Sequence, residues 1–166
     1  MNTTGLKPPC GLSEIIRVFG DIAASLTETG EPSRDWCRGH LTRIDLPFAV
    51  PLAWDKSLRA TRIHCHSKLA PILSQLFNDL VEGELGPLIE SYGGCYCFRH
   101  KRSGAELSTH AWGIALDLNV ATNHLGTKGD MPVDLVSLFE QYGFEWGGRW
   151  IGRRRDPMHF QFCRGY

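Results

Sequence analysis

The stretch LSTHAWGIALDLN, residues 107–119, decides the fold of this chain of 166 residues. It places an imidazole, His110, and a carboxylate, Asp117, seven residues apart, with small residues between them. From Ile114 to Leu118 apolar residues alternate with small or acidic ones, which is typical of a half-buried β-strand. Asp117 would then project from the strand face opposite the leucines, and the preceding loop could fold back to bring His110 to it.

A second segment, DPMHFQF over residues 156–162, carries a matching pair of side chains. The Asp156–Pro157 step favours a tight turn, which can point Asp156 and His159 at one place. Either pair alone is explained equally well by a structural hydrogen bond. Together, two histidines and two aspartates supply what a hydrolytic zinc site needs, namely three ligands and one further carboxylate.

These residues can be given roles in a hydrolytic reaction. His110, Asp117 and His159 would hold zinc and leave a fourth position for water. Asp156 would accept the proton of the water as it attacks a peptide carbonyl, and would then deliver that proton to the leaving amine.

A cation beside the carbonyl oxygen would stabilise the developing negative charge. Arg99 is the first candidate for this cation and Arg102 the second. Three tryptophans close in sequence to the site could wall a substrate pocket: Trp112, Trp146 and Trp150.

Hydrophobic periodicity predicts the helices. An apolar stripe from Leu69 to Leu80 predicts a core helix that starts near Ser67 and ends before Gly83. A second helix is predicted over 133–142, after Pro132, and a short amphipathic helix over 13–19 with Ser13 as a possible cap.

The remaining segments suggest strands and loops. Strands are predicted over 95–99 and 159–163 besides 114–118, residues 41–46 and 48–53 suggest an edge hairpin or an extended crossover, and 28–38 suggests a loop. The fold class is therefore α+β, with a small antiparallel sheet and helices packed on it.

Length and composition indicate one compact globular domain. Apolar residues make up 42% of the chain and charged residues 22%, which are ordinary values. Within this domain, residues 1–44 are expected to form an N-terminal arm and short helix that pack on the core. Residues 45–166 would form the catalytic domain.

The charge balance argues against two classes of partner. The 18 basic and 18 acidic residues cancel, so no global field draws the chain to nucleic acid or to an anionic membrane. No apolar run is long enough to span a bilayer. The first ten residues lack a signal-peptide core, so we expect synthesis in the cytoplasm without Sec export.

The cysteines and the remaining basic residues carry weaker signals. The six cysteines include no CxxC pair, and free thiols are favoured over a disulfide for Cys95 and Cys97. The run His64 to His66 resembles a ligand pair, but a structural role at the start of the core helix is favoured. The basic residues near 149–155 are either a solvated loop or an attractor for substrate carboxylates, with nucleic acid a distant third.

The pattern Ser108-x-His110-x6-Asp117, followed by Asp156-x-x-His159, resembles the D-Ala-D-Ala carboxypeptidase and L-alanyl-D-glutamate endopeptidase family of zinc peptidases. The resemblance covers roughly residues 45–163 and is strongest to the phage-lysin and prophage branch. It implies a hedgehog-type metallopeptidase core and peptidoglycan stem peptides as substrate.

The resemblance also implies residue roles. It places one zinc ion on His110, Asp117 and His159 and makes Asp156 the general base. Ser108 would line the site, and an arginine, Arg99, would orient the substrate. A monomer is favoured, and access to the cell wall is expected through holin-type release or lysis.

Alternatives remain open at this stage. Cleavage between L-Ala and D-Glu is preferred, but removal of a terminal D-Ala needs the same metal centre. A zinc-containing cell-wall binding module without turnover is a third possibility. A non-haem iron oxygenase also uses two histidines and one carboxylate, but it does not need the additional Asp156.

Overall fold

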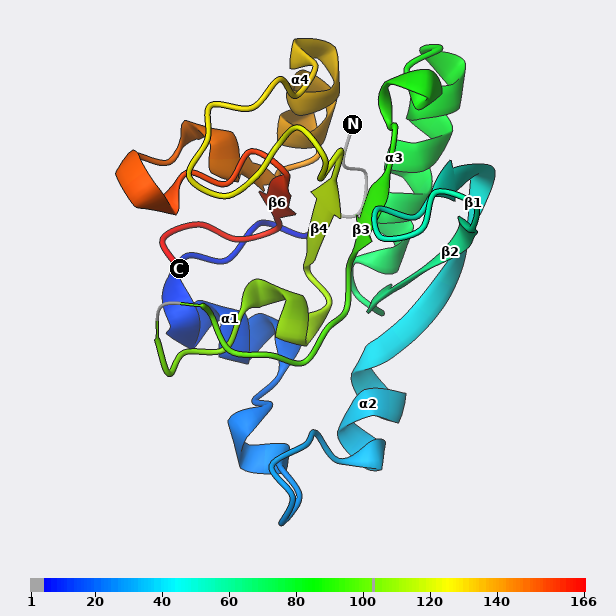
Figure 1. Cartoon of the computed structure of the whole chain (residues 1–166). Coiled ribbons are helices and arrows are strands. Elements are labelled where there is room, and N and C mark those ends of the chain that lie inside the picture. The colour runs from blue at the N-terminus through cyan, green and yellow to red at the C-terminus, as the bar shows by residue number, and fades with distance from the viewer. Residues whose placement is uncertain (1–4, 103) are drawn as a thin grey trace.

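The computed structural model describes residues 5–102 and 104–166, so the first four residues of the predicted N-terminal arm lie outside the described residues. Four α-helices surround two antiparallel sheets in the described part of the chain (Figure 1). The helices are α1 (Gly11–Phe19), α2 (Arg34–His40), α3 (Ala70–Glu82) and α4 (Val133–Gln141). The strands are β1 (Leu41–Pro51), β2 (Arg59–His66), β3 (Tyr92–Gly94), β4 (Ala115–Leu118), β5 (Glu145–Trp146) and β6 (His159–Gln161). The predicted α+β class is confirmed.

The central sheet has the strand order β3-β4-β6-β5, and each neighbouring pair is antiparallel (Figure 1). In the register of β4 and β6, Asp117 lies opposite His159 and Leu116 lies opposite Phe160. Because side chains alternate between the two faces of a sheet, Asp117 and His159 share one face. Leu116 and Phe160 share the other face and are completely buried in the core.

The second sheet pairs β1 with β2. Residues 41–46 and 48–53 were expected to form an edge hairpin or an extended crossover, but a single strand, β1, runs from Leu41 to Pro51. Its register with β2 is irregular between Asp45 and Val50, around Pro47, whose ring nitrogen has no hydrogen to donate. The proposed division of the chain after residue 44 falls inside this strand and stays a prediction.

Strand β2 corrects one placement. The run His64 to His66 was expected at the start of the core helix, but it forms the end of β2. The core helix, α3, begins at Ala70 with Pro71 in its first turn, where a missing N–H costs nothing. Its buried stripe is as predicted: Ile72, Leu73, Leu76, Phe77 and Leu80.

The predictions for the other helices are partly right. Helix α1 is confirmed, although Cys10 and not Ser13 stands at its N-cap. Helix α4 is confirmed, with three buried apolar side chains: Leu135, Val136 and Phe139. The loop predicted over 28–38 is wrong in its second half, because α2 begins at Arg34.

Helix α2 follows a capping serine. The Ser33 hydroxyl accepts a hydrogen bond from the Trp36 backbone N–H at 3.1 Å, and the Trp36 indole is buried. A cap and one buried aromatic ring therefore hold a helix of seven residues whose remaining composition is polar.

The strand predicted over 95–99 is also wrong. Strand β3 ends at Gly94, and residues 95–99 belong to no strand. They pair instead with the following segment, through Cys97 N–H to the His110 carbonyl at 3.0 Å and Ser108 N–H to the Arg99 carbonyl at 2.9 Å. Free buried thiols were favoured for Cys95 and Cys97; both are free, but only Cys95 is buried, and Cys97 is exposed.

One glycine is required by a close approach of two backbones. Gly113 has a φ of 68°, and a Cβ there would lie 2.8 Å from the His66 backbone nitrogen. The Gly113 carbonyl accepts a hydrogen bond from that same nitrogen. Any side chain at position 113 would push the His110 segment away from β2.

No helix in the described ranges combines the length and the apolar character needed to cross a membrane.

His66 is a completely buried histidine whose two ring nitrogens both have partners. Nε2 lies 3.0 Å from the Phe19 carbonyl oxygen, and Nδ1 accepts from the Lys68 backbone N–H at 3.1 Å. A carbonyl can only accept and an N–H can only donate, so the ring is held neutral. Burial lowers the pKa of His66 to about 4, against the opposing effect of the Phe19 carbonyl.

This histidine predicts a loss of stability in mild acid. Because the unfolded chain takes up a proton near pH 6.5 and the folded chain only near pH 4, folding stability falls as the pH falls between these values. We expect the wild type to lose about 3 kcal/mol more than His66→Gln over this interval, measured by urea denaturation. Proton uptake by other groups is common to both proteins and cancels in the difference. Parallel pH profiles would contradict the assignment.

Candidate metal centre

His110 lies in a single helical turn, Thr109–Trp112, directly before β4. Ser108 caps this turn, since its hydroxyl accepts a hydrogen bond from the His110 N–H at 3.4 Å. Gly113 ends the turn in the left-handed conformation and returns the chain to the sheet. The turn thus holds the His110 imidazole over the sheet face that carries Asp117.

Three side-chain atoms converge at this point. His110 Nε2 lies 3.2 Å from Asp117 Oδ1 and 3.2 Å from His159 Nδ1, and His159 Nδ1 lies 3.0 Å from Asp117 Oδ1. Among the described residues, this is the group of His, Cys, Asp and Glu side chains that is arranged to hold a metal ion. The structure therefore brings together the three residues predicted as ligands.

Hydrogen bonds on the far side of each imidazole define its tautomer. His110 Nδ1 lies 2.7 Å from the Cys95 carbonyl oxygen, which can only accept, so Nδ1 carries the hydrogen. His159 Nε2 lies 3.2 Å from Gln161 Oε1, which assigns the hydrogen to Nε2. Both nitrogens that face Asp117 are then left with lone pairs.

This donor set fits zinc. Three lone-pair atoms that face one another repel unless a proton or a cation lies between them. Zinc bonds of about 2.0–2.1 Å in a tetrahedron place neighbouring ligand atoms about 3.3 Å apart, close to the separations found here. Outer partners that fix both imidazoles are a common feature of zinc sites.

The charges within the triad support a cation at its centre. Burial alone would raise the pKa of Asp117, but positive charge and hydrogen-bond donation from the side of His110 and His159, with a proton in the place a metal would take, hold it well below its ordinary value. Burial would likewise lower the pKa of His159, yet the carboxylates of Asp117 and Asp156 raise it. A positive charge beside Asp117 is thus favoured at neutral pH.

Asp156 places a second carboxylate beside the triad. Its Oδ1 is buried without a hydrogen-bond partner among the described residues. Burial raises the pKa of Asp156, and Asp117 adds to this, while His159, Arg102 and His110 oppose it. A carboxylate with a raised pKa and a free acceptor atom is suited to receive a proton.

Gly147 holds the segment that carries Asp156. The Gly147 carbonyl accepts a hydrogen bond from the Asp156 N–H at 3.0 Å. A Cβ on Gly147 would lie 2.5 Å from the Asp156 carbonyl oxygen, so no larger residue fits. The Asp156 carbonyl in turn accepts from the His159 N–H at 3.0 Å, which forms the predicted turn between the two site residues.

The two candidate arginines occupy different places. Arg99 is half-buried in the extended segment after β3. Arg102 is exposed, and its charge lowers the pKa of Asp156. Of these two arginines, Arg102 is therefore the one whose charge is shown to act on Asp156.

The three tryptophans also differ. Trp112 is 2% exposed, and its indole N–H donates to the Gly20 carbonyl at 2.9 Å. The predicted substrate contact of Trp112 is therefore corrected, because the indole packs in the core against the end of α1. Trp150 lies beside the site, with its ring centre 5.5 Å from that of His159, and Trp146 donates to the Pro157 carbonyl.

Sequence reasoning missed the residues that support the ligands. Thr109 Oγ1 donates to Gln161 Oε1 at 3.3 Å, and Gln161 is the partner of His159. Gln161 stands two positions after His159 in a predicted strand, so the same-face spacing was an available signal. The role of the Cys95 carbonyl could not be predicted from the sequence, because every residue has a backbone carbonyl.

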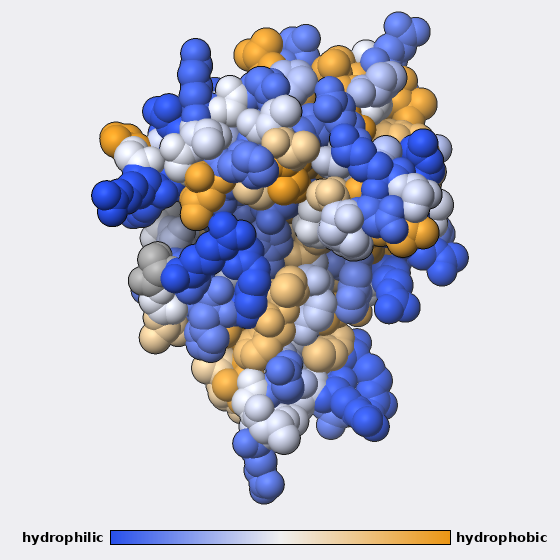
Figure 2. Space-filling view, in the orientation of Figure 1, coloured by the Kyte–Doolittle hydropathy of each residue, from blue (hydrophilic) through white to orange (hydrophobic). Residues whose placement is uncertain are grey.

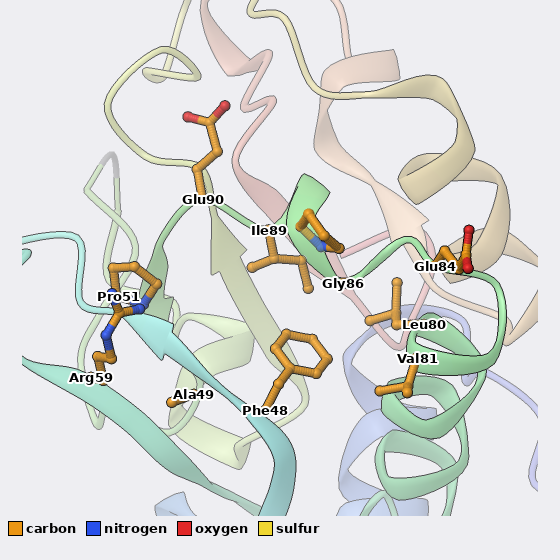
Figure 3. A pocket seen from close by; sticks show the side chains of 11 residues that line it. Phe48, Ala49, Pro51, Arg59, Leu80, Val81, Glu84, Gly86, Ile89 and Glu90 are labelled. Carbon is orange, nitrogen blue, oxygen red and sulfur yellow. The ribbon is translucent and has the colours of Figure 1, made fainter.

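A pocket of about 470 Å³ lies between β1 and α3 and contains none of the candidate site residues. Figure 3 shows apolar side chains around it, with charged side chains at its rim. Phe48, Leu80, Val81 and Ile89 form much of its wall. The candidate chemistry therefore does not depend on this pocket.

A sequence model of the family described as D-alanyl-D-alanine carboxypeptidase matches residues 101–162. The matched segment is a little over a third of the chain, and it contains His110, Asp117, Asp156, His159 and Arg102. It therefore supports a peptidase related to this family. No curated protein and no solved structure matches the chain.

The outer partner of His159 gives a test of the metal centre. Gln161→Leu removes the acceptor of the His159 Nε2 hydrogen and keeps the volume of the side chain. We expect zinc affinity, measured by competition with a chelator, to fall about 10–100-fold. Gln141→Leu changes an exposed glutamine at the end of α4 and should leave the affinity unchanged. Equal affinities for both variants would contradict the proposed geometry.

Proposed function

We propose that this chain is a zinc peptidase that hydrolyses peptidoglycan stem peptides. One arrangement carries the proposal. Ligand atoms of His110, Asp117 and His159 converge on one point, and a carboxylate oxygen of Asp156 beside them has no hydrogen-bond partner among the described residues. The match to the D-alanyl-D-alanine carboxypeptidase family supports a hydrolase that acts on such peptides.

Bound zinc would polarise the scissile carbonyl and acidify a water molecule. The proton transfers and the orientation of the metal ligands are carried out by side chains and backbone groups of the protein. Asp156 accepts the proton of the attacking water on its free oxygen and then donates it to the leaving amine. The two imidazoles keep their orientation during this transfer, because the Cys95 carbonyl and Gln161 hold their outer nitrogens.

Arg102 is the better candidate for the cation that faces the substrate. Its charge lowers the pKa of Asp156. Arg102 also lies within the segment that resembles the peptidase family, and Arg99 lies before it. We therefore propose that Arg102 stabilises the negative charge that develops on the carbonyl oxygen.

The bond that is cleaved needs a separate argument. We propose cleavage between L-Ala and D-Glu, because the motif spacing resembles lysin-type endopeptidases. The description of the matching family favours a second candidate, removal of a terminal D-Ala. Access to the cell wall by holin-type release or lysis stays a prediction.

The products of digestion distinguish these activities. Zinc-loaded protein is incubated with purified peptidoglycan and the released peptides are identified by mass spectrometry. New peptides with N-terminal D-Glu establish the endopeptidase, and loss of one alanine from pentapeptide stems establishes the carboxypeptidase. A zinc protein without any product would overturn the proposal in favour of a binding module. Iron without zinc in the protein as purified, measured by metal analysis before any zinc is added, would support the oxygenase.

Asp156→Asn tests the general base. The variant keeps the volume of the side chain and the three zinc ligands but cannot accept the proton. We expect one zinc per chain to be retained and kcat to fall by about 10²–10⁴-fold. Asp134→Asn, at an exposed position in α4, is the matched control and should keep full activity. An unchanged kcat in Asp156→Asn would refute the assigned role.

A further inference from the structure

A second pocket, of about 570 Å³, lies between the loop that follows β4 and the loop that precedes β6. Three of the residues around it are cations, and none is acidic. Its lining consists of Leu125, Gly126, Thr127, Lys128, Gly152, Arg153 and Arg155. The pocket is therefore locally positive in a chain whose formal net charge is zero.

Hydrogen bonds brace the first loop and join it to the second. The Asn123 amide is completely buried and donates to the Asn119 carbonyl at 3.0 Å and to Asp130 Oδ1 at 2.9 Å. Its oxygen accepts from the Asp130 N–H at 3.0 Å. The Gly126 N–H donates to the Arg155 carbonyl at 2.6 Å and connects the two walls. The pocket is thus formed before any ligand arrives.

The cations of this pocket have no acidic partner within the described residues. Arg149, just outside the pocket, is different: its guanidinium forms two hydrogen bonds with Glu140, at 2.6 and 2.8 Å. Lys128 and Arg153 form no ion pair, and Arg155 donates only to the neutral Trp150 carbonyl at 3.2 Å. The charges of the pocket are therefore available to an anionic ligand.

The pocket adjoins the metal centre through Trp150. Arg155 holds the Trp150 carbonyl, and the Trp150 ring lies 5.5 Å from that of His159. Arg155 also directly precedes Asp156. Figure 2 shows strongly hydrophilic side chains, with apolar ones beside them, over the projection that residues near 150 form at the left of Figure 1. A chain of contacts from Arg155 through Trp150 to His159 therefore connects the pocket lining to the triad.

We propose that this pocket is a subsite for carboxylate groups of an acidic peptide, and that it binds the stretch of substrate next to the scissile bond. This inference rests on the proposed function and defines its substrate class as stems with free carboxylates. A D-glutamate linked through its γ-carboxyl keeps a free α-carboxylate, which arginine can bind through two parallel hydrogen bonds. Nucleic acid fits less well, because no aromatic side chain lines the pocket for a base to stack on.

Binding can be tested without turnover. The probe is the dipeptide γ-D-glutamyl-L-lysine, which contains neither of the bonds proposed for cleavage, and its α-amide at the glutamate. Full-length zinc-loaded protein is titrated with each, and backbone amide shifts in residues 125–128 and 152–155 are followed by NMR. We expect the free acid to bind more tightly than the amide and to shift these amides.

Charge reversal locates the subsite. The double variant Lys128→Glu/Arg153→Glu should weaken binding of the free acid about 5-fold or more, as expected for two exposed charge pairs. Arg34→Glu makes a charge reversal on exposed α2, at the bottom of Figure 1, and should leave binding unchanged. In turnover assays the double variant should raise KM and leave kcat unchanged.

Each other outcome has a definite meaning. Equal affinity for acid and amide, or shifts confined to other residues, would overturn the subsite. Weaker binding of a single-stranded oligonucleotide by the double variant, with unchanged peptide binding, would overturn it in favour of nucleic acid. An inactive protein that still prefers the free acid would refute the proposed peptidase activity while leaving the subsite intact.

Discussion

The antiparallel pairing of β4 with β6 is the constraint on which the site depends. It places Asp117 directly opposite His159, so two residues 42 positions apart in the chain become neighbours on one sheet face. A slip of one residue would turn one of the two side chains toward the core and remove the site. Leu116 and Phe160 oppose such a slip, because it would expose apolar side chains that are now completely buried. The core therefore maintains the register that the chemistry needs.

The third ligand depends on local geometry. His110 is positioned by one capped turn. The left-handed Gly113 and its contact with β2 determine where that turn lies. Hydrogen bonds from both imidazoles to fixed acceptors then point the lone pairs at Asp117. The lone pairs of three side chains meet at a site from which water is largely excluded. This raises the free energy of the folded state unless a cation is bound. If zinc binds as proposed, relief of this cost would contribute to its affinity and would couple metal binding to stability.

Much of the site could be predicted from sequence, and less of the fold. Sequence patterns pointed to His110, Asp117 and His159, because strand alternation and the Asp156–Pro157 turn involve only residues that are neighbours in the chain. Helix α3 was predicted for the same reason, since its apolar stripe follows the helical period. Prediction failed at α2, where the local cap Ser33 was not used as a signal, and at β2, whose pairing with β1 was not expected; Figure 1 labels both elements. The burial of Trp112 could not be predicted locally, because its partner, the Gly20 carbonyl, lies 92 residues before it.

The most direct test of the central claim is X-ray absorption spectroscopy at the zinc edge of the protein loaded with one equivalent of zinc. Zinc bound by His110, Asp117, His159 and water should be a four-coordinate ion with only nitrogen and oxygen neighbours at about 2.0–2.1 Å, and with outer-shell scattering from two imidazoles. A sulfur neighbour at about 2.3 Å would contradict it, because the metal would then be held by a cysteine. The absence of imidazole scattering would contradict it equally, since the converging lone pairs of His110 and His159 would then have another purpose.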